Sequence, residues 1–70
     1  MSIHAQLSRI REATGARTQA DIARILGIKQ PSIAAAIRTG RVPARWYMAL
    51  MRQGISPTWI ESGTGNRHVA

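Results

Sequence analysis

The chain has 70 residues, of which ten are Lys or Arg and three are Asp or Glu, giving a formal net charge of +7. This length suits one small domain, and the absence of cysteine excludes disulfides, thiolate metal ligands and cysteine nucleophiles. The longest strongly apolar run, residues 46–51, is much shorter than the roughly 20 residues of a membrane helix. Because the N-terminus also lacks the pattern of a secretory signal, we expect a cytoplasmic protein with a polyanionic partner.

The first predicted helix covers residues 3–14. Ile3, Leu7 and Ile10 recur at the spacing of a one-sided helix. Ser2 is a suitable N-cap, and Gly15 can adopt the left-handed conformation that ends a helix.

The second predicted helix covers residues 19–26. Thr18 and Asp21 have the spacing of a capping box, with Asp in place of the usual Glu. Gly27 supplies the positive φ that a tight turn needs. The residues expected to face inward are Ile22, Ala23 and Leu26.

A third helix is predicted to begin at Gln30 or Pro31 and to end at Thr39, before Gly40. Proline suits the first turn of a helix, where its missing N–H would have no partner. The buried stripe of this helix is expected to consist of Ile33, Ala36 and Ile37. Two short helices joined at a glycine have the layout of a helix-turn-helix, which places its second helix in the DNA major groove.

The remaining helices are predicted at residues 43–53 and after the Ser56-Pro57 cap, where Trp59 and Ile60 follow. The fold class is therefore all-α, a compact bundle of five short helices. We assign residues 1–63 to one domain and residues 64–70 to a flexible polar tail.

The outward face of the third helix is small and polar, so its backbone can approach base edges. Gln30 can pair with adenine, Ser32 can donate or accept, alanine methyls can contact thymine methyls, and a nearby arginine can reach guanine. The predicted base contacts are Gln30, Ser32, Ala34, Ala35 and Arg38.

Phosphate contacts are expected beside that helix. The exposed N–H groups at the start of the second helix favour an anion, and Gln19 there is placed to brace Gln30. The predicted phosphate contacts are Arg17, Thr18, Gln19, Lys29, Arg41 and Arg45. Solvated faces are expected for Arg9, Arg11 and Arg52, and Arg67 lies in the tail.

The fourth helix is apolar on more than one face, which suggests self-association. We expect a homodimer contact at Met48, Met51 and Ile55. The two histidines are isolated and the three acidic residues are scattered. We therefore expect no metal site, no catalytic residue, no cofactor, no small-molecule ligand and no enzymatic activity.

The segment TQADIARILGIKQPSIAAAIRTG, residues 18–40, resembles the helix-turn-helix of bacteriophage CI-type repressors, the Cro/CI-like family. The likeness continues in VPARWYMAL and GISPTWIESGTG, which match that family's Pro-x-x-Trp and Gly-Val-Ser-x-x-Trp-Leu segments. It implies a lambda-repressor-like fold and a dimeric repressor of a near-palindromic operator. The positions that match the family's recognition residues are Gln19, Gln30, Ser32, Ala34, Ala35 and Arg38.

The resemblance implies either a short Cro-like regulator or the DNA-binding domain of a longer repressor. Lys29-Gln30-Pro31 replaces the family's usual Ser-Gln-Ser, so we expect the third helix to be capped differently. Two other functions stay open: a protein-interaction module of antitoxin-like type on the same fold, and non-specific coating of nucleic acid by charge.

Overall fold

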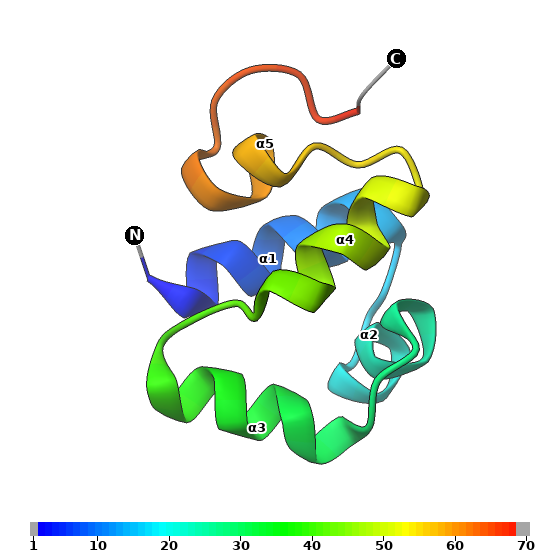
Figure 1. Ribbon diagram of the computed structural model, residues 1–70, viewed down its shortest axis with the longest axis vertical. Coiled ribbons are helices and arrows are strands. Elements are labelled where there is room, and N and C mark those ends of the chain that lie inside the picture. The colour runs from blue at the N-terminus through cyan, green and yellow to red at the C-terminus, as the bar shows by residue number, and fades with distance from the viewer. Residues whose placement is uncertain (1, 69–70) are drawn as a thin grey trace.

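Each predicted helix is present in the computed structural model, which describes residues 2–68 (Figure 1). The helices are α1 Ile3–Thr14, α2 Gln19–Leu26, α3 Gln30–Thr39, α4 Ala44–Arg52 and α5 Pro57–Ser62. Among the described residues, extended pairing is limited to one isolated bridge. The Cα radius of gyration is 10.9 Å, close to the roughly 11 Å expected of a folded chain of this length. The described part of the chain is thus a compact all-helical bundle.

The helix ends follow local chemistry. The Ser2 hydroxyl accepts a hydrogen bond from the Ala5 N–H at 3.2 Å and caps α1. Gly15 and Gly27 end α1 and α2 in the left-handed conformation, at φ values of 79° and 69°. The helix expected at residues 43–53 is one residue shorter at each end, because Pro43 is extended and acts as the N-cap of α4.

Every helix contributes to a single hydrophobic core, which burial of apolar surface stabilises. Helix α3 packs against α1 and α2, whereas α4 packs against α2 and α5. Figure 1 accordingly shows α3 at the edge of the molecule, with one side toward the bundle. The largest fully buried side chains are Ile10, Ile22, Ile33, Trp46, Leu50 and Ile60.

The tail differs from the expectation. Residues 67–68 contact the bundle: the Ser56 N–H donates to the Arg67 carbonyl at 2.8 Å, and Ile55 forms a bridge with His68. The Arg67 guanidinium contacts a Glu12 carboxylate oxygen at 2.7 Å and lies 5.2 Å from the centroid of a Trp59 ring. Residues 67–68 of the predicted flexible tail are thus held against the bundle, residues 64–66 are exposed, and residues 69–70 lie outside the described part.

Arg9 was also expected on a solvated face, but it is partly buried and connects α1 to the end of α5. Its guanidinium donates to the carbonyls of Ile60 and Glu61 at 2.9 and 3.2 Å. These carbonyls belong to the last turn of a helix, where they lack intrahelical donors and where a cation is favourable. Arg9 is thus a structural residue.

No helix in residues 2–68 is both long enough and apolar enough to cross a membrane.

Candidate nucleic-acid interface

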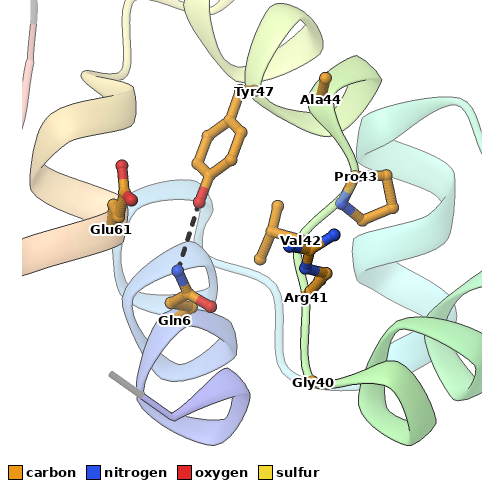
Figure 2. A pocket seen from close by; sticks show the side chains of 8 residues that line it. All are labelled: Gln6, Gly40, Arg41, Val42, Pro43, Ala44, Tyr47 and Glu61. Carbon is orange, nitrogen blue, oxygen red and sulfur yellow. Dashed lines mark hydrogen bonds between the residues drawn. The ribbon is translucent and has the colours of Figure 1, made fainter.

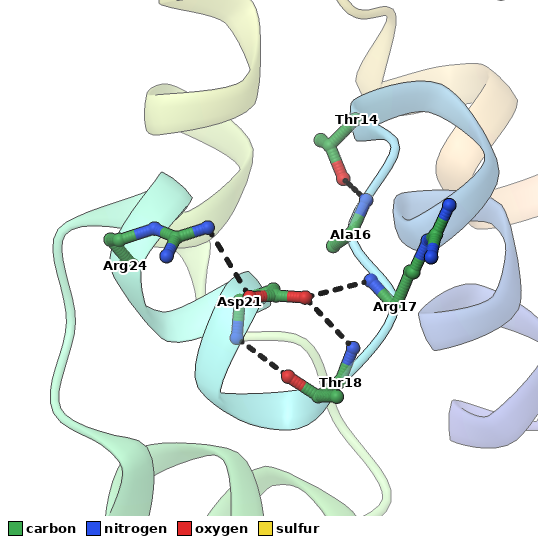
Figure 3. Close-up of polar contacts among 6 residues, drawn as sticks. All are labelled: Thr14, Ala16, Arg17, Thr18, Asp21 and Arg24. Carbon is green, nitrogen blue, oxygen red and sulfur yellow. Dashed lines mark hydrogen bonds and ion pairs between the residues drawn. The ribbon is translucent and has the colours of Figure 1, made fainter.

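A reciprocal cap holds the start of α2 (Figure 3). The Thr18 hydroxyl accepts from the Asp21 N–H at 3.1 Å, and the Asp21 carboxylate accepts from the N–H groups of Arg17 and Thr18 at 3.1 and 3.3 Å. Arg24 contacts the second carboxylate oxygen at 3.2 Å. The predicted capping box is therefore confirmed.

This cap determines which groups at the helix start remain for an anion. The hydrogen bond from the Arg17 N–H, aided by Thr18 and the charge of Arg24, lowers the pKa of Asp21 below its usual value. Asp21 thus stays ionised, and its charge is offset by these donors. Gln19 and Ala20 are exposed residues whose N–H groups precede the first intrahelical hydrogen bond of α2.

The turn after α2 sets the direction of α3. The Gly27 N–H donates to the Arg24 carbonyl at 3.3 Å, and the Ile28 N–H donates to the Ala23 carbonyl at 2.9 Å. Ala23 is buried, which lets the two helices approach closely. Lys29 precedes α3, and no side chain caps this helix, in agreement with the expectation of different capping.

Helix α3 has a buried side and an uncovered side. Ile33 and Ala36 are 0% and 3% exposed. The predicted base contacts lie on the uncovered side: Gln30, Ala34 and Arg38 are exposed, while Ser32 and Ala35 are half-buried. Pro31 and Thr39 are also exposed. Solvent reaches all five predicted base contacts, but they are spread around the uncovered side of α3: Gln30 and Ala34 border one hollow, whereas Ser32 lines a different groove.

Gln19 and Gln30 meet at a shallow hollow between α2 and α3, with a volume of about 360 Å³. Pro31 and Ala34 complete its lining. No hydrogen bond joins the two glutamine side chains among the contacts of residues 2–68, so Gln19 does not brace Gln30 directly here. The hollow places two amides beside small apolar surfaces, a combination that matches the polar edges and methyl groups of base pairs.

Exposed cations surround α3. Arg17 precedes α2, Lys29 precedes α3, Arg41 follows α3, and Arg45 lies in the first turn of α4. The ion pairs of the described residues join Arg24 to Asp21 and Arg67 to Glu12, so these four side chains are not neutralised by an acidic neighbour. Thr18 keeps its hydroxyl hydrogen for donation, because its oxygen is the acceptor within the cap. All six predicted phosphate contacts are exposed.

The loop that carries Arg41 borders a second hollow, with a volume of about 470 Å³ (Figure 2). Inside it, the buried Gln6 amide donates to the Tyr47 hydroxyl at 3.2 Å. Burial, and secondarily the charge of Glu61, raises the pKa of Tyr47 above its usual value. This contact ties α1 to α4, and the Arg41 N–H donates to the Ala36 carbonyl at the end of α3 at 3.2 Å.

The structure contradicts the prediction for one of the three dimer residues, Ile55. Met48 and Met51 are 58% and 54% exposed, so a partner can reach both. Ile55 is only 2% exposed and belongs to the core of this chain. It follows the left-handed Gly54, which turns the chain back toward the bundle, so Ile55 offers no surface to a second copy.

Arg52 is exposed, as expected, and it lines a groove together with Lys29 and Arg45, which the sequence did not indicate. Arg45 and Arg52 are seven positions apart, about two helical turns, which places them on one face of α4. Lys29 lies beside this face because α2 packs against α4. The local sequence does not indicate this packing.

Comparisons of the chain with protein-family models, with curated proteins and with solved structures gave no match. Within residues 2–68, no three His, Asp or Glu side chains gather where they would hold a metal ion.

Proposed function

We propose that this chain is a sequence-specific regulator of transcription that binds double-stranded DNA, a repressor of phage or prophage type. In this proposal α2, the turn at Gly27 and α3 form a helix-turn-helix within a lambda-repressor-like fold. The protein acts as a homodimer in the cytoplasm of a bacterial host and has no catalytic activity. The observation that carries the proposal is the slim, solvent-exposed side of α3, held from behind by Ile33 and bordered by unneutralised cations.

The side chains on that surface supply a base-reading set. Gln30 pairs with the N6 and N7 groups of adenine, and Arg38 reaches O6 and N7 of guanine. Ala34 and Ala35 contact thymine methyl groups, and Ser32 donates or accepts at a neighbouring base. Because these residues are mostly short, the α3 backbone can lie deep in the major groove.

The surrounding donors position the helix without reading sequence. Gln19, Thr18 and the free N–H groups at the start of α2 bind one phosphate. The cations that bind further phosphates are Arg17, Lys29, Arg41 and Arg45. Neutralising about four phosphates per subunit gives a slope of roughly −3 to −4 for log K against log salt.

A homodimer matches an operator with two half-sites. Two observations bear on where we place such a contact: Ile55 is buried, and Arg45 and Arg52 share a face of α4 with Met48. Pairing that face across a two-fold axis would bring like charges together. We therefore propose a dimer on DNA whose contact does not centre on Met48, with Met51 as the remaining predicted residue.

The test is selection of binding sites from a random duplex library, followed by titration of the selected duplex. We expect a short inverted repeat with half-sites about one helical turn apart and an affinity at least ~10³-fold above that for unrelated duplex. Gln30→Ala and Arg38→Ala should relax the preference at particular base pairs. Arg24→Ala, the matched control, removes a cation from the exposed side of α2 and should change all duplexes equally.

Two results would replace this proposal. Equal affinity for every duplex would indicate non-specific coating of nucleic acid. Weak DNA binding at ~0.15 M salt, far below the affinity of a specific regulator, would favour a protein-interaction module of antitoxin-like type. Its partner binding should survive Gln30→Ala and Arg38→Ala.

A further inference from the structure

A groove with a volume of about 470 Å³ separates the turn after α2 from α4. We call it the α2–α4 groove. Its apolar lining comes from Leu26, Ile28, Met48 and Ala49, and its basic lining from Lys29, Arg45 and Arg52. Gly27 and Ser32 complete it.

The charge of this groove is of one sign. No acidic residue lines it, and the ion pairs of residues 2–68 involve other arginines. Its cations are exposed, and Met48 is 58% exposed although it is a large apolar side chain. Arg45, Met48 and Arg52 have the i, i+3, i+7 spacing that places side chains along one helix face. An exposed methionine between two arginines therefore forms one continuous surface.

A second copy of this chain and a DNA backbone both complement this surface poorly. A second copy of the chain would set the cations of both grooves against each other, and like charges at an interface are costly. A DNA backbone would neutralise the cations, but it would leave Ile28 and Met48 without apolar contact. A partner that carries both negative charge and an apolar side chain would complement both kinds of lining.

We propose that the α2–α4 groove binds an acidic, amphipathic helical segment of another protein. Its carboxylates pair with Lys29, Arg45 and Arg52, and an apolar side chain inserts between Ile28 and Met48. The unbranched, polarisable side chain of methionine adapts to different apolar groups, as on other surfaces that receive amphipathic helices. The proposal goes beyond DNA binding and does not require it.

Lys29 and Arg45 also belong to the proposed phosphate contacts. An acidic segment in the groove would occupy two cations that the DNA backbone uses. The groove partner would therefore lower the affinity for DNA, and this provides a route by which a second protein releases the regulator from its site.

The experiment measures peptide binding in the absence of DNA, so its result is independent of the proposed function. The probe is a fluorescent peptide of about 16 residues, long enough for helix formation, with glutamates on one face and leucines on the other. A control peptide keeps the glutamates and has glutamine in place of each leucine. We expect saturable binding at ~0.15 M salt for the first peptide and at least tenfold weaker binding for the control.

Paired variants locate the site. Met48→Gln should weaken binding of the leucine-containing peptide about tenfold, as expected for loss of one buried apolar side chain. Arg52→Gln should also weaken binding. Arg11→Gln, its matched control, changes an exposed arginine outside the groove lining and should leave binding unchanged. Equal binding of both peptides, or equal effects of the two arginine variants, would overturn the proposal.

Discussion

The Thr18 hydroxyl and the Asp21 carboxylate each accept a hydrogen bond from the other residue's backbone N–H, at 3.1 and 3.3 Å. This exchange satisfies donors that a helix start otherwise leaves unpaired. It also joins the loop before α2 to its first turn, so the exposed side chains of Arg17 and Gln19 extend from a fixed backbone. The proposed phosphate site therefore depends on a local structural contact.

Replacing Asp21 with Asn should make stability less dependent on pH. The pKa of Asp21 is lowered in the folded protein, so its ionised form stabilises the fold at pH values above the unfolded pKa. That contribution is lost as the pH falls through the lower, folded pKa. We expect the difference in unfolding free energy between wild type and Asp21→Asn to be constant above about pH 5 and to shrink below about pH 4.

Urea unfolding across this pH range measures the effect. Glu12→Gln is the control, because it removes a carboxylate that is not part of the cap of α2. A pH-independent difference between wild type and Asp21→Asn would contradict the assignment of the cap.

Substitution of Gly27 should destabilise the fold through backbone conformation alone. A Cβ at this position would meet no atom within 4 Å, but φ is +69°, where side chains other than glycine are strained. Gly27→Ala should cost about 1 kcal/mol and Gly27→Val more, since branched residues resist this region most. Gly27→Asn should cost least. Thermal unfolding of the three variants should give this order, and a different order would exclude backbone strain as the cause.

Substitutions at two adjacent positions of α3 should affect stability and DNA binding separately. Ile33→Ala removes a fully buried side chain and should cost about 2–5 kcal/mol. Ala34→Glu adds a charge to the exposed side and should leave stability within about 0.5 kcal/mol. If α3 enters the major groove, Ala34→Glu should abolish specific binding through repulsion of phosphates. If the Ala34→Glu protein folds and binds the selected duplex with unchanged affinity, α3 does not contact the DNA.

Arg67→Ala should release the tail without unfolding the bundle. The ion pair with Glu12 is exposed, and the guanidinium covers one face of Trp59. The loss should amount to about 1 kcal/mol or less, because exposed ion pairs and exposed cation–π contacts are weak. Tryptophan fluorescence should report greater solvent access at Trp59, since Trp46 is fully buried. Glu12→Gln removes only the ion pair and should leave this fluorescence unchanged.

The sequence alone predicts the five helices because their signals are local. Ser2, Thr18 and Ser56 have side chains that accept from the first turn of a helix, and glycines with positive φ follow α1, α2 and α3. The apolar spacing of α3 likewise identifies Ile33 and Ala36 as buried, whereas Ile37, the third residue of the predicted stripe, is only half-buried. Such patterns act within a few residues, where chain geometry is nearly constant.

Only the tertiary structure decides where the irregular segments and the long cations lie. Ile55 is buried and not exposed because the turn at Gly54 directs it into the core, although no periodic pattern includes it. Arg9 and Arg67 contact residues more than fifty positions away, and Lys29 joins Arg45 and Arg52 around one groove. Long flexible side chains reach partners that the packing of helices places beside them. Such contacts depend on the whole fold, whereas caps and stripes depend on neighbouring residues.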